Sequence, residues 1–304
     1  ILYTADLVAL IESHGLSPHL YADDAQILGS CCPTNTAVLR PRMETCIADV
    51  GGWMSSNRLQ LNTAKTEVMW CSSARRRQQV PADCFVIGPD SVAPITCVRD
   101  LGLYLDATMS MRQHITRLTS TCFGVLRQIR TIRRCLTSRA RNILVTCFVF
   151  ARLDYCNSAF AGLSRCDLDR LQAVQNAAVR LVAGARKYDH VTPLLRDRHW
   201  LPVEQRIHFK IAVTVYKCLH GLSADYLSDF TRPSTASTIS QRLRSADRQQ
   251  LYVPRSNTRM GDRSFAVAGP STWNRLPATV TAAPSLAVFK KQLKTFLFAE
   301  AYSV

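Results

Sequence analysis

Residues 19–28 read His19-Leu20-Tyr21-Ala22-Asp23-Asp24-Ala25-Gln26-Ile27-Leu28, and this stretch decides the fold of the amino-terminal part. Apolar residues flank a polar centre on both sides, and aspartate is a favoured turn former. The stretch therefore predicts two short strands joined by a turn with two adjacent carboxylates. Carboxylates suit hard divalent cations, and two such cations about 4 Å apart can promote phosphoryl transfer. Asp23 and Asp24 are thus candidate metal ligands, although paired aspartates also occur in turns without catalytic function.

The sequence after this stretch alternates strand-like runs with one amphipathic helix. Apolar residues recur every three to four positions from Leu39 to Met54, which is the spacing of a helix face. Pro41 fits such a helix only near its first turn. Three further short strands are expected at Glu67–Cys71, Cys84–Ile87 and Leu101–Leu105. This mixture predicts an α+β fold class for residues 1–106, with an antiparallel sheet and a helix.

A helical pattern begins at Ser110 and continues to the end of the chain. The first apolar stripe runs from Met111 to Ile132 at three-to-four spacing. Further helices are expected at residues 138–152, 168–182, 203–219 and 285–298. The predicted organisation is an α+β unit at 1–106, a helical domain at 107–188 and a basic carboxy-terminal domain at 189–304. In the last domain, a Ser/Thr/Arg-rich stretch near 231–264 lacks periodicity, so we expect it to be flexible.

The charge balance indicates a polyanionic partner. Thirty-eight basic residues against 22 acidic ones give the chain a net charge of +16, and arginines recur along most of its length. Nucleic acid fits better than an acidic membrane surface, because a membrane-surface protein concentrates its basic residues on one amphipathic helix. A basic surface with no specific partner is the alternative that charge alone leaves open.

The densest stretch of one charge sign lies between Asp106 and Asp154, where nine arginines occur without an acidic residue. Arg127, Arg130 and Arg134 keep three-to-four spacing, so we expect them to share one helix face and to follow the phosphates of a nucleic-acid duplex. A solvated face is the alternative, but unbalanced arginines repel one another and favour bound anions.

The twelve cysteines show no pattern typical of a disulfide framework or a zinc site, because no C-x-x-C or paired histidine spacing occurs. Most lie in apolar runs, where a reduced cysteine behaves as a small hydrophobic residue. We therefore expect a reducing, intracellular compartment. No apolar stretch approaches the roughly 20 residues that a membrane-spanning helix needs, so no membrane partner is expected.

Several motifs resemble those of one known family. Tyr21-Ala22-Asp23-Asp24 is similar to the Y-x-D-D box of reverse transcriptases, in the form common in non-LTR (LINE-type) retrotransposons. Residues 53–67 match the pattern W-x-x-x-N-x-L-x-L-N-x-x-K-T-E, and residues 101–106 match L-G-x-x-L-D. Segments at 171–181, 200–210 and 273–277 also resemble LINE-type polyproteins. Trp200 and Trp273 in these segments lie among apolar neighbours, so we expect both to pack in the core, with base stacking as the alternative. The resemblance covers nearly the whole chain.

The resemblance implies a role for each motif residue. Asp23 would bridge two Mg²⁺ ions with Asp24 beside it, and Tyr21 would pack near the primer end. Lys65 would protonate the pyrophosphate leaving group, with a solvated surface lysine as the alternative. The implied partners are an RNA template, a DNA primer or target, and dNTPs.

The same resemblance assigns domains. Residues 1–106 would be a partial palm that contains the Tyr-Ala-Asp-Asp hairpin, and residues 107–188 would be a thumb whose arginines hold the primer–template duplex. The carboxy-terminal domain would bind element RNA or target DNA. Nuclear action is implied by the family, and no motif specifies an oligomeric state.

The resemblance also implies that the chain is a fragment. Reverse transcriptases carry a further catalytic aspartate on a strand before the Y-x-D-D box, and we expect the chain to begin after that strand. Two carboxylates would hold Mg²⁺ only weakly without the third. We therefore expect a fragment of an RNA-directed DNA polymerase that is inactive as this chain alone. The alternative is a non-catalytic nucleic-acid-binding relic or a co-opted binding protein.

Overall fold

The computed structural model describes residues 2–233 and 250–303. It divides into two compact units, Ile1–Ser110 and Met111–Val304, which we describe separately. The stretch near 231–264 that was predicted to be flexible includes residues 234–249, which lie outside the described residues.

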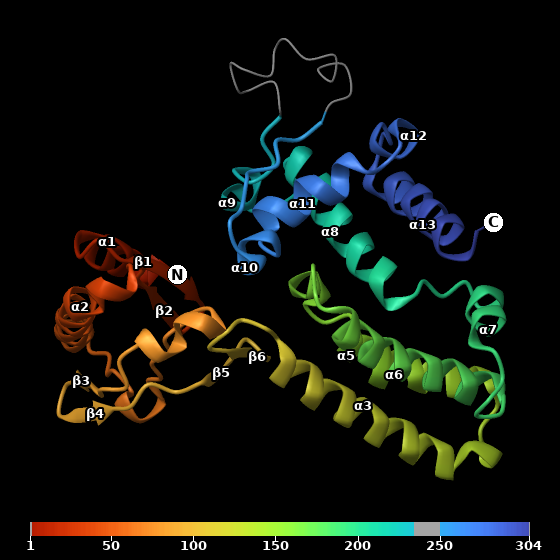
Figure 1. The fold of residues 1–304 in the computed structure, drawn as a ribbon, viewed down its shortest axis with the longest axis horizontal. Helices are drawn as coiled ribbons and strands as arrows, with labels where there is room; N and C mark the ends of the chain where they lie inside the picture. The colour runs from red at the N-terminus through yellow and green to blue at the C-terminus, as the bar shows by residue number, and fades with distance from the viewer. Residues whose placement is uncertain (1, 234–249, 304) are drawn as a thin grey trace. The chain divides into compact units, whose positions relative to one another are not determined.

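The first unit combines two α-helices with short antiparallel hairpins (Figure 1). Its strands pair only with their sequence neighbours, as β1 with β2, β3 with β4 and β5 with β6. The elements are α1 (Ala5–Ser13), β1 (Ser17–Tyr21), β2 (Asp24–Leu28), α2 (Thr36–Ser56), β3 (Phe85–Ile87), β4 (Asp90–Val92), β5 (Cys97–Asp100) and β6 (Leu103–Asp106). This mixture agrees with the predicted α+β class, although the described strands form separate hairpins in place of one sheet.

The strand expected at Glu67–Cys71 is absent from the described structure. This segment makes only single backbone hydrogen bonds to its neighbours, from Ile95 N to Val68 O at 2.8 Å and from Ser72 N to Ala107 O at 2.9 Å. Isolated bonds of this kind hold a chain in place but do not form a ladder. The apolar residues of this segment that suggested a strand, Val68 and Trp70, instead pack against β3.

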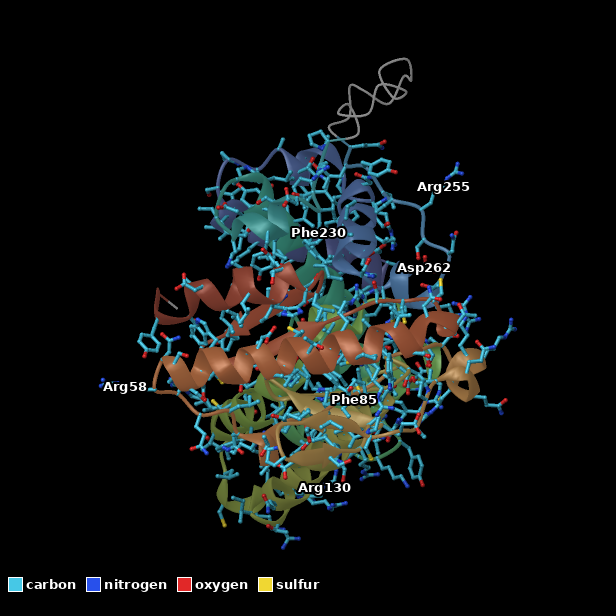
Figure 2. All side chains as sticks on the ribbon, turned by 90° about the vertical axis from the view of Figure 1, so that its left-hand side faces the viewer. Arg58, Phe85, Arg130, Phe230, Arg255 and Asp262 are labelled. Carbon is cyan, nitrogen blue, oxygen red and sulfur yellow. The ribbon has the colours of Figure 1, made fainter. Side chains whose placement is uncertain are left out.

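Helix α2 supplies the core of the first unit. Its buried residues Leu39, Cys46 and Val50 pack against Leu7 and Ile11 of α1, as the apolar spacing predicted. The helix begins earlier than that spacing indicates, because a 3-10 turn at Pro33–Asn35 leads directly into it. On another side of α2, Ile47 packs with Phe85 and Ile87 of β3; Figure 2 labels Phe85.

The last residue of β6 anchors the turn that ends the first unit. The Asp106 carboxylate, which is only 7% exposed, accepts four hydrogen bonds within the next four residues. Thr108 donates from its backbone N (3.1 Å) and hydroxyl (2.6 Å), and Ser110 from its backbone N (2.9 Å) and hydroxyl (3.0 Å). Burial alone would raise the pKa of Asp106, but these donors together hold the pKa below its ordinary value of 3.8.

We expect Asp106→Ala to destabilise the first unit by about 1.5–3 kcal/mol at pH 7, because hydrogen bonds to a charged acceptor would be lost. A carboxyl with a depressed folded pKa contributes its stability above pH 3.8, and that contribution disappears as the pH falls through the folded pKa. Urea unfolding should therefore separate variant and wild type at pH 7 and bring them closer below about pH 3. Asp90→Ala, at an exposed position in β4, is the control. An equal effect of both substitutions would contradict the anchoring role.

The second unit is helical in its described part. Its elements are α3 (Arg112–Thr131), α4 (Ser138–Val145), a π-helical turn (Thr146–Phe150), α5 (Ala151–Leu153), α6 (Arg165–Ala183), α7 (Val191–Asp197), α8 (Val203–Leu219), α9 (Asp225–Ser228), α10 (Arg259–Asp262), α11 (Phe265–Asn274), α12 (Ala278–Thr281) and α13 (Leu286–Tyr302). Helices α3 and α6 lie side by side, as Figure 1 shows. Their facing stripes are buried, with Ile115 and Cys122 on α3 and Val174 and Ala178 on α6 fully enclosed.

A second core forms where α8, α11 and α13 meet. The Phe289 ring is fully buried and stacks on Tyr216 and on Trp273, with centroid distances of 4.4 and 5.7 Å. The Tyr216 hydroxyl donates to the Ala283 carbonyl at 3.0 Å, which satisfies its polar end. The prediction that Trp273 is a packing residue is confirmed by its exposure of 5%.

Two extended segments are joined beside this core. Pro233 and Leu251 form an isolated antiparallel bridge, and Tyr252 N donates to Arg232 O at 2.9 Å. The Asn274 side chain donates to Leu251 O and accepts from Leu251 N, both at 2.8 Å, so that it imitates a neighbouring strand. Leu251 is consequently buried.

Among the described helices, none is long and apolar enough to cross a membrane.

Candidate functional site

The hairpin formed by β1 and β2 carries the predicted metal ligands. Its register pairs Tyr21 with Asp24 and Ser17 with Leu28, so only Ala22 and Asp23 form the connection. This confirms the predicted strand–turn–strand structure. Ala22 adopts φ 55°, in the left-handed region that a side chain disfavours. Strained residues of this kind are held in place by their surroundings and concentrate at functional sites.

The two faces of this hairpin differ in polarity. Leu20 and Ile27 pack into the apolar cluster around α1 and α2. Gly29 follows the hairpin directly, and a Cβ there would lie 2.8 Å from Leu39 Cδ1, so glycine lets the chain pass close to α2. The opposite face is open to solvent around Tyr21 and Asp24. Asp23 therefore lies at an exposed tip with Asp24 beside it.

Gln26 extends the polar face of the hairpin. Its side-chain amide donates to Asp100 Oδ1 at 2.6 Å, which links β2 to the end of β5. Side chains alternate along a strand, so Gln26 lies on the same face as Asp24. This link was not predicted from the sequence, because strand alternation places Gln26 on the polar face but does not indicate a partner 74 positions away.

Asp23 and Asp24 offer part of a ligand set for Mg²⁺. Both carboxylates are exposed and offer hard oxygen ligands. Among the residues described, no group of three or more His, Cys, Asp or Glu side chains is placed to hold a metal ion. Magnesium is often held by one or two carboxylates together with the phosphates of a substrate. Mg²⁺ at this pair would need further ligands from another source.

The other residues predicted for the first-unit site are Lys65 and Tyr21. Lys65 ends a 3-10 turn at Thr63–Lys65 and is exposed. Tyr21 is 65% exposed, so its ring is available to a ligand. The structure thus brings Tyr21, Asp23 and Asp24 together and records no hydrogen bond or ion pair between Lys65 and either carboxylate.

The predicted arginines lie on the second unit. Arg127 and Arg130 are exposed on α3, and Figure 2 labels Arg130. Arg134 is also exposed but lies in a 3-10 turn at Arg133–Cys135. The expectation that all three share one helix face is wrong for Arg134, because α3 ends at Thr131. Within the described residues no ion pair neutralises any of these guanidinium groups.

Two glutamines within residues 171–181 connect helix α6 to the start of helix α8. Gln175 is fully buried on α6 and donates to Leu201 O at 2.9 Å, while Gln172 accepts from Val203 N at 2.9 Å. These bonds fix the start of α8 against α6. They account for both glutamines as structural residues.

An ion pair and two aromatic contacts complete the same junction. Arg206 pairs with Asp154 and lies over the Phe150 ring, 4.9 Å from its centroid. The Phe150 ring in turn meets Trp200 edge-on at a centroid distance of 4.6 Å. Trp200 therefore has a packing role, which was the favoured interpretation of its sequence context.

The first unit thus presents two exposed carboxylates at a hairpin turn, and Arg127, Arg130 and Arg134 of the second unit have no acidic partner among the described residues. Over 215 residues the chain is 26% identical to a protein of Drosophila melanogaster described as "Probable RNA-directed DNA polymerase from transposon BS". The match covers 67% of this chain and 23% of that protein, so the chain spans about a quarter of its relative's length.

This similarity supports a relationship to reverse transcriptases. No known family profile matches the chain. No solved structure matches it either.

Proposed function

We propose that this chain is the carboxy-terminal part of a LINE-type RNA-directed DNA polymerase. The observation that carries the proposal is the two-residue hairpin turn, which presents Asp23 and Asp24 beside Tyr21 on a rigid support. The first unit would be part of the palm, and residues 107–188 would be the thumb. The similarity to a transposon polymerase supports this assignment.

Each candidate residue would have a separate role in nucleotidyl transfer. Asp23 and Asp24 would hold Mg²⁺, and Mg²⁺, when bound, supplies charge neutralisation for nucleotidyl transfer. Tyr21 would pack against the primer end. Lys65 would give a proton to the departing pyrophosphate, which requires that ligand binding bring its ammonium within hydrogen-bond reach. The partners would be an RNA template, a DNA primer or target, and dNTPs.

A second candidate function is nucleic-acid binding without catalysis. It is favoured by the absence of a third metal-binding side chain near the aspartates in the described residues. Exposed arginines need no metal to bind phosphates. Both candidate functions therefore use the arginines of the helical unit, and only the polymerase function requires metal binding at the hairpin.

We expect the purified 304-residue protein to incorporate no dNTPs on a primed RNA template with Mg²⁺. An extended protein, in which a reverse-transcriptase segment that carries the further catalytic aspartate is fused before Ile1, should incorporate them. In that protein Asp23→Asn should lower the rate by about tenfold or more, because a metal ligand that neutralises developing charge is lost.

Asp90→Asn in the same extended protein is the control, since Asp90 is exposed on β4 outside the hairpin. Incorporation by the 304-residue chain would show that two carboxylates suffice. An extended protein that binds RNA but never incorporates dNTPs would favour the binding function.

A further inference from the structure

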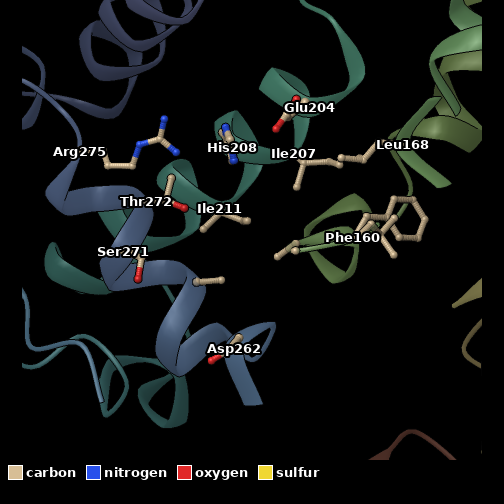
Figure 3. A pocket seen from close by; sticks show the side chains of 14 residues that line it. Phe160, Leu168, Glu204, Ile207, His208, Ile211, Asp262, Ser271, Thr272 and Arg275 are labelled. Carbon is tan, nitrogen blue, oxygen red and sulfur yellow. The ribbon is translucent and has the colours of Figure 1, made fainter. Parts of the chain in front are cut away.

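The second unit contains a cavity of about 270 Å³ that has no part in the proposed polymerase site. Two helices line it with the same periodicity. Helix α8 contributes Glu204, Ile207, His208 and Ile211. Helix α11 contributes Ala268, Ser271 and Thr272, and Arg275 follows directly after its end. Residues 160–163 form the third wall, and Figure 3 shows how these side chains converge.

The cavity exists because α8 and α11 approach closely at Gly269, while the α11 side chains that face the space are small. A Cβ at Gly269 would lie 3.3 Å from Val215 Cγ2, so the helices are nearly in contact there. Ala268 before Gly269, and Ser271 and Thr272 after it, are too small to fill the space toward α8. The space therefore follows from the sequence of α11.

Three polar side chains face this cavity with free hydrogen-bonding capacity. No hydrogen bond is recorded for the His208 ring or for the hydroxyls of Ser271 and Thr272 among the described residues. Burial first, and then the charge of Arg275, lower the pKa of His208 below 6.5, while Glu204 and Glu300 act against this. A neutral imidazole offers one donor and one acceptor.

Two of the charged side chains at the rim are paired. Arg275 lies 3.3 Å from Glu300, and Glu204 lies 3.3 Å from Arg165. Asp262 also lines the cavity, and no ion pair of its carboxylate occurs among the described residues. Figure 3 shows the Arg275 side chain directed toward His208. A rim whose arginine is paired and whose remaining charge is a carboxylate does not favour a phosphate. The cavity suits a neutral group whose edge carries both donors and acceptors.

We propose that this cavity binds a single unpaired nucleobase of a nucleic-acid strand. The base would lie against the apolar side chains of Ile207 and Ile211, with its edge toward His208, Ser271 and Thr272. Bases displaced from a stack are commonly held in this way, between apolar surfaces and hydrogen-bonding groups. The sugar and phosphates would remain outside. This inference rests on the proposed function only in requiring a nucleic-acid partner.

Fluorescence anisotropy with two probes tests the proposal on the full chain. One probe is a short single-stranded RNA of mixed sequence, and the other is an abasic strand of equal length. Wild type should bind the RNA more tightly. Ser271→Phe should fill the cavity and weaken RNA binding about tenfold, because the hydrogen bonds of one enclosed base edge, which contribute about that much, would be lost. His208→Ala should act in the same direction. Neither variant should change binding of the abasic strand.

The controls are Thr279→Phe, which adds the same ring at an exposed position of α12, and His190→Ala, which removes an exposed histidine. Circular dichroism verifies that each variant is folded. If Ser271→Phe does not fold, the comparison of the two probes is made with His208→Ala alone. Unchanged RNA binding by the folded variants would overturn the base pocket and leave the proposed function intact. Failure of wild type to bind either strand would overturn both.

Discussion

Phe289→Ala should lower the free energy of unfolding of the second unit by about 3–5 kcal/mol, which is the usual cost of removing a buried aromatic ring. Phe289 is fully buried and stacks on both Tyr216 and Trp273. Its removal would leave a void between α8, α11 and α13 that these rings cannot fill without losing their own contacts. The expected result is a large shift of the unfolding midpoint in urea.

Val288→Ala is the matched control on the same helix. Val288 is 37% exposed, so its truncation should cost well under 1 kcal/mol. If Phe289→Ala were as mild as Val288→Ala, α13 would not belong to the core of the unit. An unchanged slope of the denaturant dependence would show that both variants unfold from the same compact state.

Replacing Arg127, Arg130 and Arg134 by Gln should flatten the salt dependence of duplex binding. Each phosphate contact contributes about 0.9 to the slope of log K against log salt, so three lost contacts should reduce the slope by about 2.7. The three guanidinium groups are exposed and have no recorded acidic partner, so they are free to release counterions from phosphates. The measurement is binding of an RNA–DNA duplex across about 50 to 200 mM salt.

Arg165→Gln is the control for charge removal at a paired site. The Arg165 guanidinium already lies 3.0 Å from Asp169 and 3.3 Å from Glu204. Its loss should alter the slope much less than the loss of one unpaired arginine. A triple variant with the slope of wild type would rule out phosphate tracking by this surface.

Helices were predictable from the sequence where their apolar stripes are regular. Helix α8 has the predicted bounds, Val203–Leu219, because its inward positions repeat without interruption. The helix expected at 138–152 occurs as α4, the π-helical turn and α5, since one inserted residue leaves the apolar pattern almost unchanged.

Helix α11 was not predicted, and its sequence explains why. Gly269 and Pro270 are ordinarily helix breakers, yet both lie within α11. Gly269 is needed there because α8 passes so close. Tertiary packing overrides local propensity at this position, and single-sequence patterns contain no information about the approach of a distant helix.

The candidate site was predictable only in its local parts. The turn at Asp23 follows from residues that are adjacent in sequence. The contact between Gln26 and Asp100 joins residues 74 positions apart, and no motif spacing indicates it. Arg134 was assigned to a helix face by its spacing, but that helix ends three residues earlier, at Thr131.

The bridge between Pro233 and Leu251 makes the burial of Leu251 depend on a residue that is distant in the sequence. Asn274 holds Leu251 from the other side through one donated and one accepted hydrogen bond. A carboxylate at position 274 would accept but could not donate, and an aliphatic side chain would do neither. The residue type at position 274 is thus restricted by a segment that lies 23 residues earlier in the chain.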